Sequence, residues 1–158
     1  MSNPNRAHNI LTPFMTLLGW QLLSAQDGVS EVLLTLRPEH LNTWAVAHGG
    51  VTMTLADVAL ATAAHSLSDD GVGVVTIEMK VTFMQPGIGE LRAIGRVLHR
   101  STSMAYCEGD IRDSEKRLVA KALGTLKYTR RLADGHEVRP QIASDDAAAK
   151  KIGAPTDC

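Results

Sequence analysis

The sequence GVTMTLADVALATAAHS at residues 50–66 decides the fold class of this 158-residue chain. It is rich in Ala and Leu, contains no proline and carries almost no charge apart from Asp57. Good helix formers without a breaker predict a helix, and a helix with so little polar surface has to be enclosed by other elements. We therefore expect one long helix buried against a sheet.

Segments with strand character stand on both sides of this helix. Apolar and polar residues alternate along residues 29–37 and 75–84, which is the period of a strand and not of a helix, and three more strand-like runs follow. The expected strands are residues 29–37, 75–84, 91–100, 104–112 and 118–128. Turn-prone joints separate the last four at residues 85–87, 100–102 and 113–116. Because these joints are short, we expect the last four strands to form an antiparallel meander.

The two ends of the chain frame this core. Thr12 followed by Pro13 is typical of a helix start and predicts a short helix that ends at Gly19. One curved sheet wrapped around one long helix makes a single α+β domain, which we place at residues 1–130. Residues 131–158 are polar and irregular, and we expect them to form a peripheral, mobile tail.

Charge and cysteine content exclude several classes of function. The chain has 16 Lys and Arg residues against 17 Asp and Glu residues, so broad attraction to nucleic acid or to an anionic membrane is not expected. No uncharged run approaches the ~18 residues of a membrane span, and the first nine residues lack the apolar stretch of a signal peptide. Cys107 and Cys158 form no disulfide framework or metal-ligand spacing. We expect a cytoplasmic protein without a metal or cofactor.

Asp57 is the side chain of the predicted helix that most needs an explanation. Burying a carboxylate without partners costs several kcal/mol, so a lone Asp in a helix is ordinarily solvated or hydrogen-bonded. By helical spacing its face is shared by small residues, namely Gly50, Thr54, Ala61 and Ala64. A row of small side chains beside a carboxylate leaves room for a ligand or for a second helix.

His48-Gly49-Gly50 opens the same helix. N–H groups in a first turn have no acceptor within the helix and carry the positive end of its dipole. Glycine lets a carbonyl group approach closely, so the Gly49 N–H can stabilise negative charge that develops on a carbonyl oxygen. The same two glycines also suit a tight loop that enters a helix, and we interpret His48 as an orienting or capping residue. Cys107, inside a predicted strand, is expected to be an inert core thiol.

The sequence NTWAVAHGG at residues 42–50, followed by LAD at residues 55–57, resembles the phenylacetate-pathway branch of the hotdog-fold thioesterases. That family has an Asn or Gln six residues before the His of His-Gly-Gly and an Asp or Glu nine residues after it. Asn42, His48 and Asp57 stand at these positions here. The pattern is specific because it fixes three residue types and two spacings.

The resemblance covers residues 13–128. It implies the hotdog fold, in which a curved antiparallel sheet wraps one long central helix, and the activity of an acyl-coenzyme A thioesterase. The pattern departs at Ala45, where many relatives carry a glycine. That departure concerns the conformation of the loop before the helix and not the pair formed by Gly49 and Asp57.

The resemblance also implies roles for individual residues. Asp57 would be the nucleophile or general base, Gly49 the oxyanion donor, and His48 with Asn42 would position substrate or water. The residues expected to contact substrate are Gly50, Thr76, Arg100, Ser101 and Thr102. The turn at residues 100–102 matches one that often meets coenzyme A phosphates, although a solvated hairpin has the same composition.

Two other functions occur on this fold, namely a dehydratase or hydratase and a non-catalytic acyl-coenzyme A-binding protein. The order of His-Gly-Gly and then Asp disfavours a dehydratase. A sensor would normally carry a second, partner-binding domain, which does not fit this length. The sequence leaves the preferred acyl group open.

The spacing of the two candidate groups also predicts an assembly. Gly49 and Asp57 are eight residues apart, which is ~12 Å along one helix. One carbonyl group cannot lie within ~3 Å of both, so we expect a homodimer with active sites shared between antiparallel helices. The resemblance further implies a homotetramer built as a dimer of dimers.

Overall fold

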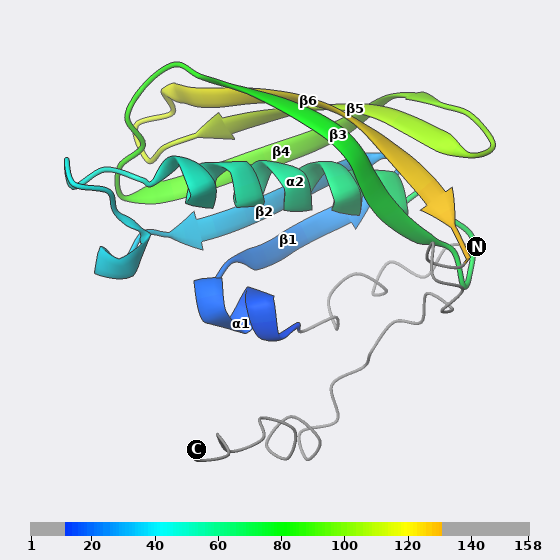
Figure 1. Ribbon diagram of the computed structural model, residues 1–158, viewed down its shortest axis with the longest axis horizontal. Coiled ribbons are helices and arrows are strands. Elements are labelled where there is room, and N and C mark those ends of the chain that lie inside the picture. Colours follow the sequence, from blue (N-terminus) through cyan, green and yellow to red (C-terminus); the bar gives the residue numbers. More distant parts are fainter. Residues whose placement is uncertain (1–11, 131–158) are drawn as a thin grey trace, which may run out of the picture.

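Six antiparallel strands form one curved sheet in the computed structural model, which describes residues 12–130 (Figure 1). In chain order the elements are α1 (Pro13–Leu18), β1 (Gln21–Gln26), β2 (Val29–Thr35), a 3-10 turn (Pro38–His40), α2 (Gly49–His65), β3 (Gly73–Phe83), β4 (Glu90–Arg100), β5 (Met104–Arg112) and β6 (Leu118–Thr129). The order across the sheet is β1-β2-β4-β5-β6-β3, and α2 lies against its concave face. The predicted α+β architecture is confirmed.

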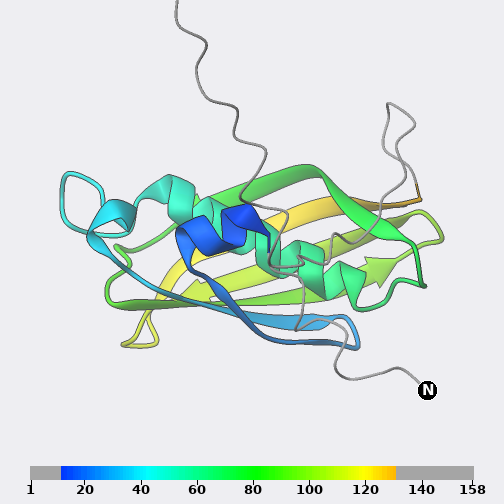
Figure 2. The same ribbon diagram turned by 90° about the horizontal axis from the view of Figure 1, so that it is seen from below.

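The short first helix is also confirmed. The Thr12 side chain caps α1 by accepting the Met15 N–H, and Gly19 ends it in the left-handed conformation. Figure 2 shows α1 beside the first half of α2, where Phe14 and Leu18 line a hollow together with α2 residues. The predicted tail at residues 131–158 lies outside the described residues.

The position of β3 corrects the predicted meander. β3 pairs with β6 at the edge of the sheet, whereas β4 pairs with β2 and β5. Only β4, β5 and β6 form a meander. The joint at residues 84–89 is short, yet it does not form a hairpin. β3 and β4 are three strand spacings apart, which is ~14 Å, and six extended residues can span ~20 Å. The joint can therefore pass the ends of β5 and β6. Its N–H groups at Met84 and Gln85 donate to the Val119 carbonyl, which holds the joint against β6.

One strand was missed. β1 reads QLLSAQ and lacks a clean alternation, yet it pairs with β2 through a tight turn at Asp27 and Gly28. Both turn residues have positive φ, 52° and 78°, as a type I′ hairpin requires. The Asp-Gly pair was therefore the sequence signal for this strand.

The sheet covers α2 on one side only. Leu55, Ala59 and Leu60 are fully buried beneath it. Met53 is 44% exposed, and Asp57 is only partly buried. Among residues 12–130, the sheet thus encloses the helix on one side, and no other element encloses it on the side of Met53 and Asp57, which we call the open side. Ala64 is fully buried and does not belong to the open side, where its spacing had placed it.

A glycine on β4 allows α2 to lie this close to the sheet. A Cβ at Gly95 would be 2.3 Å from the Ala59 carbonyl oxygen, which also accepts the Ser30 hydroxyl at 2.6 Å. An added Cβ at Gly95 would thus meet backbone atoms of α2, and neither the strand nor the helix can move away without a cost in free energy. At Gly109 on β5, the nearest atom to an added Cβ is the flexible end of Leu60 at 3.3 Å.

We therefore expect Gly95→Ala to lower the free energy of unfolding by about 3 kcal/mol, and Gly109→Ala by about 1 kcal/mol or less. Urea denaturation followed by circular dichroism measures both. Equal, small losses in the two variants would show that the helix does not rest on β4 at this distance.

Within residues 12–130, no helix has the length and apolar character needed to cross a membrane.

Candidate active site

The first turn of α2 offers one unused backbone donor. His48 is the N-cap, and its Nδ1 accepts the Gly50 N–H at 2.9 Å, so the predicted capping role of this histidine is present. The Gly49 N–H makes no hydrogen bond to another residue of the described segment. It therefore remains available to an outside acceptor at the positive end of the helix dipole.

The loop before α2 is held by Asn42. Its Oδ1 accepts the Trp44 N–H at 2.9 Å and the Val46 N–H at 3.4 Å. Between them Ala45 has a φ of 57°, a left-handed conformation that glycine adopts more easily. The loop thus keeps a glycine-type conformation with alanine in place. Since its oxygen is occupied, Asn42 has only its amide N–H groups left for a ligand.

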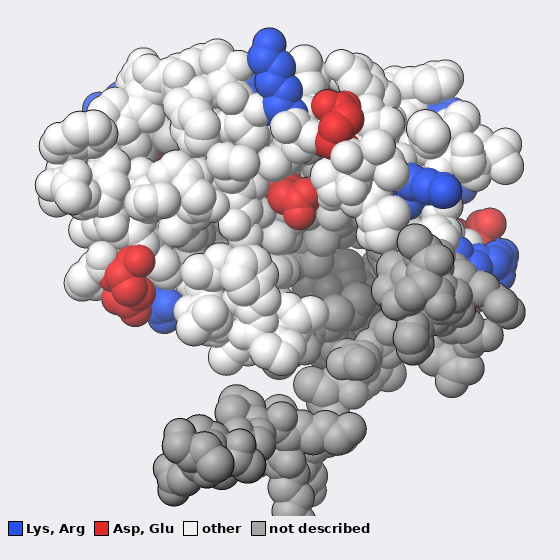
Figure 3. All heavy atoms as spheres, in the orientation of Figure 1, with Lys and Arg blue, Asp and Glu red and all other residues white. Residues whose placement is uncertain are grey.

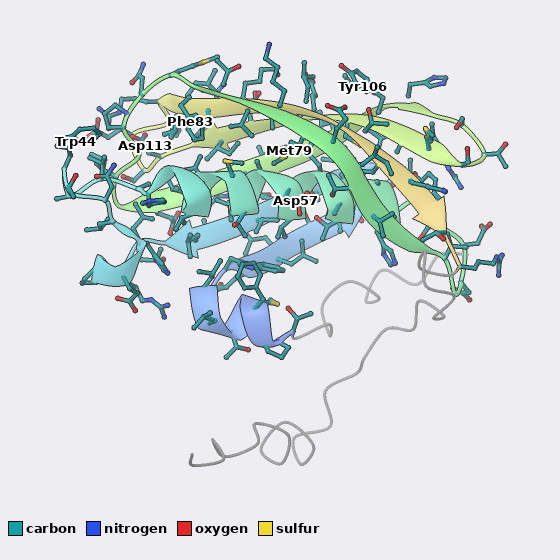
Figure 4. All side chains as sticks on the ribbon, viewed as in Figure 1. Trp44, Asp57, Met79, Phe83, Tyr106 and Asp113 are labelled. Carbon is teal, nitrogen blue, oxygen red and sulfur yellow. The ribbon has the colours of Figure 1, made fainter. Side chains whose placement is uncertain are left out.

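Asp57 is oriented by a threonine on β3. The Thr76 hydroxyl donates to Asp57 Oδ1 at 2.6 Å, a short charge-assisted bond. Asp57 Oδ2 has no hydrogen-bond partner among the described residues. Figure 4 shows Asp57 midway along α2, below β3. The register of β3 against β6 shifts between Thr76 and Glu78, and this bulge changes the direction of the strand where it meets the carboxylate.

The turn at residues 100–102 lies at the far end of α2. The Arg100 guanidinium stacks on the Tyr128 ring at 5.1 Å, and the Tyr128 hydroxyl donates to the Ala64 carbonyl at 3.1 Å. Ser101 closes the hairpin through its hydroxyl, which accepts the Met104 N–H at 3.0 Å. Thr102 is exposed at the tip. From Ala64 back to the helix start is ~22 Å, so the structure does not bring this turn to Gly49 of the same chain.

The two groups assigned to one carbonyl are also apart. α2 runs without a break from Gly49 to His65, which leaves Gly49 and Asp57 ~12 Å apart along its axis. The chain brings Thr76 to Asp57, and His48 to Gly50, but not Asp57 to Gly49.

A groove of about 390 Å³ lies beside Gly49. Its apolar lining comes from Trp44, Val46, Phe83, Met84, Pro86 and Val119. The polar side chains along it are Asn42, Thr52 and Gln85, and none of the described residues that line it is charged. Trp44 and Phe83, which Figure 4 labels toward the end of the molecule where α2 begins, are 81% and 51% exposed. Neither had been singled out from the sequence.

Two other reactive groups are structural. Burial raises the pKa of the Cys107 thiol to about 11, which makes it the inert core thiol that was predicted. Asp113 is buried in the β5–β6 turn, where it accepts the N–H groups of Glu115 and Arg117 and pairs with the Arg117 guanidinium at 2.6 Å. Burial alone would raise the pKa of Asp113, but the bonds from Arg117 outweigh it and hold the pKa below its usual value. Both groups are buried inside the fold.

Metal ligation has no candidate in the described part of the chain. Residues 12–130 contain no group of three or more His, Cys, Asp or Glu side chains placed to hold an ion.

Comparison with known proteins gives the family. Residues 45–120 match the thioesterase superfamily. A putative esterase of Archaeoglobus fulgidus is 32% identical over 112 residues, which cover 70% of this chain and 71% of that protein. The acyl-coenzyme A thioesterase PaaI of Escherichia coli is 29% identical over 105 residues, covering 65% and 73%. The structure of a conserved protein of Pseudomonas aeruginosa has a TM-score of 0.73 at 31% identity, covering 78% and 99%.

The chain therefore belongs to the thioesterase superfamily. It is a PaaI-like thioester hydrolase with the hotdog fold, so the predicted family, fold and class of enzyme are confirmed.

Proposed function

We propose that the protein hydrolyses acyl-coenzyme A to a free acid and coenzyme A, with Asp57 as nucleophile or general base and the Gly49 N–H as oxyanion donor. The observation that carries this proposal is the Asp57 carboxylate itself, which lies on the open side of α2 with one oxygen fixed by Thr76 and the other without a hydrogen-bond partner in residues 12–130. The similar PaaI protein of Escherichia coli is named for acyl-coenzyme A hydrolysis, which supports the substrate class.

The chemistry needs only this free oxygen. Asp57 Oδ2 either attacks the thioester carbon or removes a proton from the water that attacks it. In both routes a carbon–oxygen bond forms, negative charge moves onto the carbonyl oxygen, and the carbon–sulfur bond breaks to release the thiolate, which takes up a proton. When water attacks, this step gives the free acid directly; when Asp57 attacks, it gives a mixed anhydride, which a water molecule then hydrolyses to the free acid and the regenerated carboxylate. An N–H at the start of a helix stabilises the carbonyl oxygen as its charge grows. The Thr76 hydroxyl keeps the carboxylate in place throughout.

A homodimer with shared sites is part of the proposal. β3 is an edge strand of the described sheet, so one row of its backbone groups has no strand partner within residues 12–130, and its Ile77 is 54% exposed. The open side of α2 lies on the same face and carries few charged side chains (Figure 3). A second copy related by a two-fold axis can cover both, and its antiparallel helix then places Gly49 of one chain opposite Asp57 of the other. The dimer of dimers stays a prediction.

This arrangement also gives the turn at residues 100–102 a place. Arg100 lies ~10 Å beyond Asp57 toward the C-terminal end of the same helix, on the concave side of the sheet. In the proposed dimer it stands past Gly49 of the partner chain, where the coenzyme A arm leaves the thioester. We assign Arg100, Ser101 and Thr102 to the phosphates on that basis, and His48 and Gly50 to the shape of the oxyanion turn.

Gly49→Ala is expected to lower activity without lowering stability. A Cβ at this position would meet only the Phe83 ring, at 3.6 Å and 3.7 Å, and alanine is a better helix former than glycine. The fold therefore tolerates a side chain at this position. A carbonyl group bound to the Gly49 N–H, in contrast, needs the space that glycine leaves. We expect kcat/KM to fall by about tenfold or more at an unchanged or higher melting temperature. Full activity in this variant would remove Gly49 from the site.

The direct test of function is a panel of acyl-coenzyme A compounds with a thiol reagent that reports free coenzyme A. Release of thiol supports the proposal. Interconversion of an enoyl and a 3-hydroxyacyl thioester without thiol release would instead show a hydratase or dehydratase. Tight binding with no turnover of any compound would show a non-catalytic binding protein. The cytoplasmic location stays a prediction.

A further inference from the structure

The groove beside Gly49 has no role yet in the proposed reaction. It is formed by the loop at residues 42–47, the start of α2 and the joint between β3 and β4. A thioester oxygen bound to the Gly49 N–H would place the rest of the thioester at the mouth of this groove. Either the acyl group or the coenzyme A arm must then occupy it.

The lining of the groove decides between these occupants. Coenzyme A carries phosphates, and no lysine, arginine or histidine of residues 12–130 lines the groove. The candidate for the phosphates, Arg100, lies at the other end of α2. The largest side chains in the groove are two exposed aromatic rings, Trp44 and Phe83, and their burial against an apolar group is favourable. The acyl group is the part of the substrate that matches such a lining.

Resting on the function proposed above, we infer that this groove is the acyl pocket, that it takes uncharged apolar acyl groups, and that Phe83 limits the bulk allowed at the carbon next to the carbonyl. The Phe83 ring lies 3.6 Å from the position of a Cβ on Gly49, which is already van der Waals contact. The inference places the acyl carbon of a carbonyl bound at the Gly49 N–H beside the same ring. A methyl branch on that carbon therefore meets the ring.

Three six-carbon thioesters test the inference: hexanoyl-, 2-methylpentanoyl- and adipoyl-coenzyme A. Wild type is expected to prefer hexanoyl over 2-methylpentanoyl by about tenfold or more in kcat/KM, because one misplaced methyl group in an apolar pocket has an effect of this size. Adipoyl-coenzyme A carries one free carboxylate, which would find no cation among the described residues of the groove, so we expect its kcat/KM to be about tenfold or more below that of hexanoyl-coenzyme A as well.

Phe83→Ala should bring the ratio of hexanoyl to 2-methylpentanoyl close to one, and Phe83→Leu should give an intermediate ratio. The preference against adipoyl should stay, since removing a ring supplies no cation. Phe14→Ala is the matched control, because Phe14 is 53% exposed against 51% for Phe83 and also lies by the start of α2, but lines a separate hollow. We expect the wild-type ratio in this variant.

The outcomes separate this inference from the proposed function. Hydrolysis of all three thioesters at similar rates by wild type would overturn the acyl pocket while leaving the thioesterase in place. An unchanged ratio in both folded Phe83 variants would overturn the role of Phe83 in the same way. Release of thiol from other members of the acyl-coenzyme A panel but from none of these three would overturn the acyl pocket alone, whereas no release from any compound of the panel would contradict the proposed function itself, and the acyl pocket with it.

Discussion

Asp57→Asn is expected to reduce thioester hydrolysis by about 10²- to 10⁴-fold while leaving the fold intact. Asparagine keeps the shape of the side chain, and its amide oxygen can still accept the Thr76 hydroxyl that now lies 2.6 Å from Asp57 Oδ1. What the variant loses is the charge and the basic oxygen, which both proposed routes require. A nucleophile or general base contributes about 3 to 5 kcal/mol to the transition state, whereas a solvated carboxylate contributes almost nothing.

The neighbouring strand offers a matched control in Glu78. Its Oε1 accepts the Thr125 hydroxyl at 2.7 Å, so both carboxylates are bonded to a threonine at nearly the same distance. Thr125 points away from α2, since Gly124 and Leu126 on either side of it are buried. Glu78→Gln should therefore retain wild-type kcat/KM. A folded Asp57→Asn protein with wild-type turnover would be incompatible with the proposed mechanism.

The elements of this fold were readable because their signals are local, whereas their pairing is not. The apolar composition of residues 50–66 predicts α2, and the period of two predicts β2 through β6, since each pattern depends only on neighbouring residues. The neighbour of β3 depends on how far a short joint can reach. Six residues can close a hairpin between neighbouring strands or cross the ends of two strands. The hydrogen bonds from the joint to the Val119 carbonyl hold it in the second arrangement, and these bonds join residues that are far apart in the sequence.

The site residues also fall into those that the sequence alone indicated and those that it did not. Gly49 and Asp57 stood out because a glycine at a helix start and a lone carboxylate in an apolar helix are unusual in any sequence. Phe83 did not, because an aromatic residue at the end of a strand has the composition of a core residue. Its exposure and its position next to the start of α2 follow from the edge position of β3, which was not predicted from the sequence. The residues of the functional pattern could therefore be recognised from the sequence, whereas the residues that line the surface around them could not.

Mixing two inactive variants is expected to restore about a quarter of wild-type activity. The first is Asp57→Asn. The second is Gly49→Asp, which should fold because a carboxylate in the first turn of a helix is stabilising, yet it places negative charge where the oxyanion forms. If each site combines Asp57 of one chain with Gly49 of the other, every heterodimer holds one intact site and one doubly altered site. Random reassortment makes about half of the dimers mixed, and half of their sites active.

A double variant carrying both changes provides the opposite experiment. Mixed with an equal amount of wild type before reassortment, it should leave about half of the activity; after reassortment, about a quarter, because each heterodimer then has one fault in each of its two sites. Sites built within one chain predict different results for both mixtures. The two single variants would stay inactive together, and the double variant would leave half of the activity however long the subunits exchange. Subunit exchange itself is checked by mass spectrometry of isotope-labelled chains, so an inactive mixture of fully exchanged single variants would rule out the shared site.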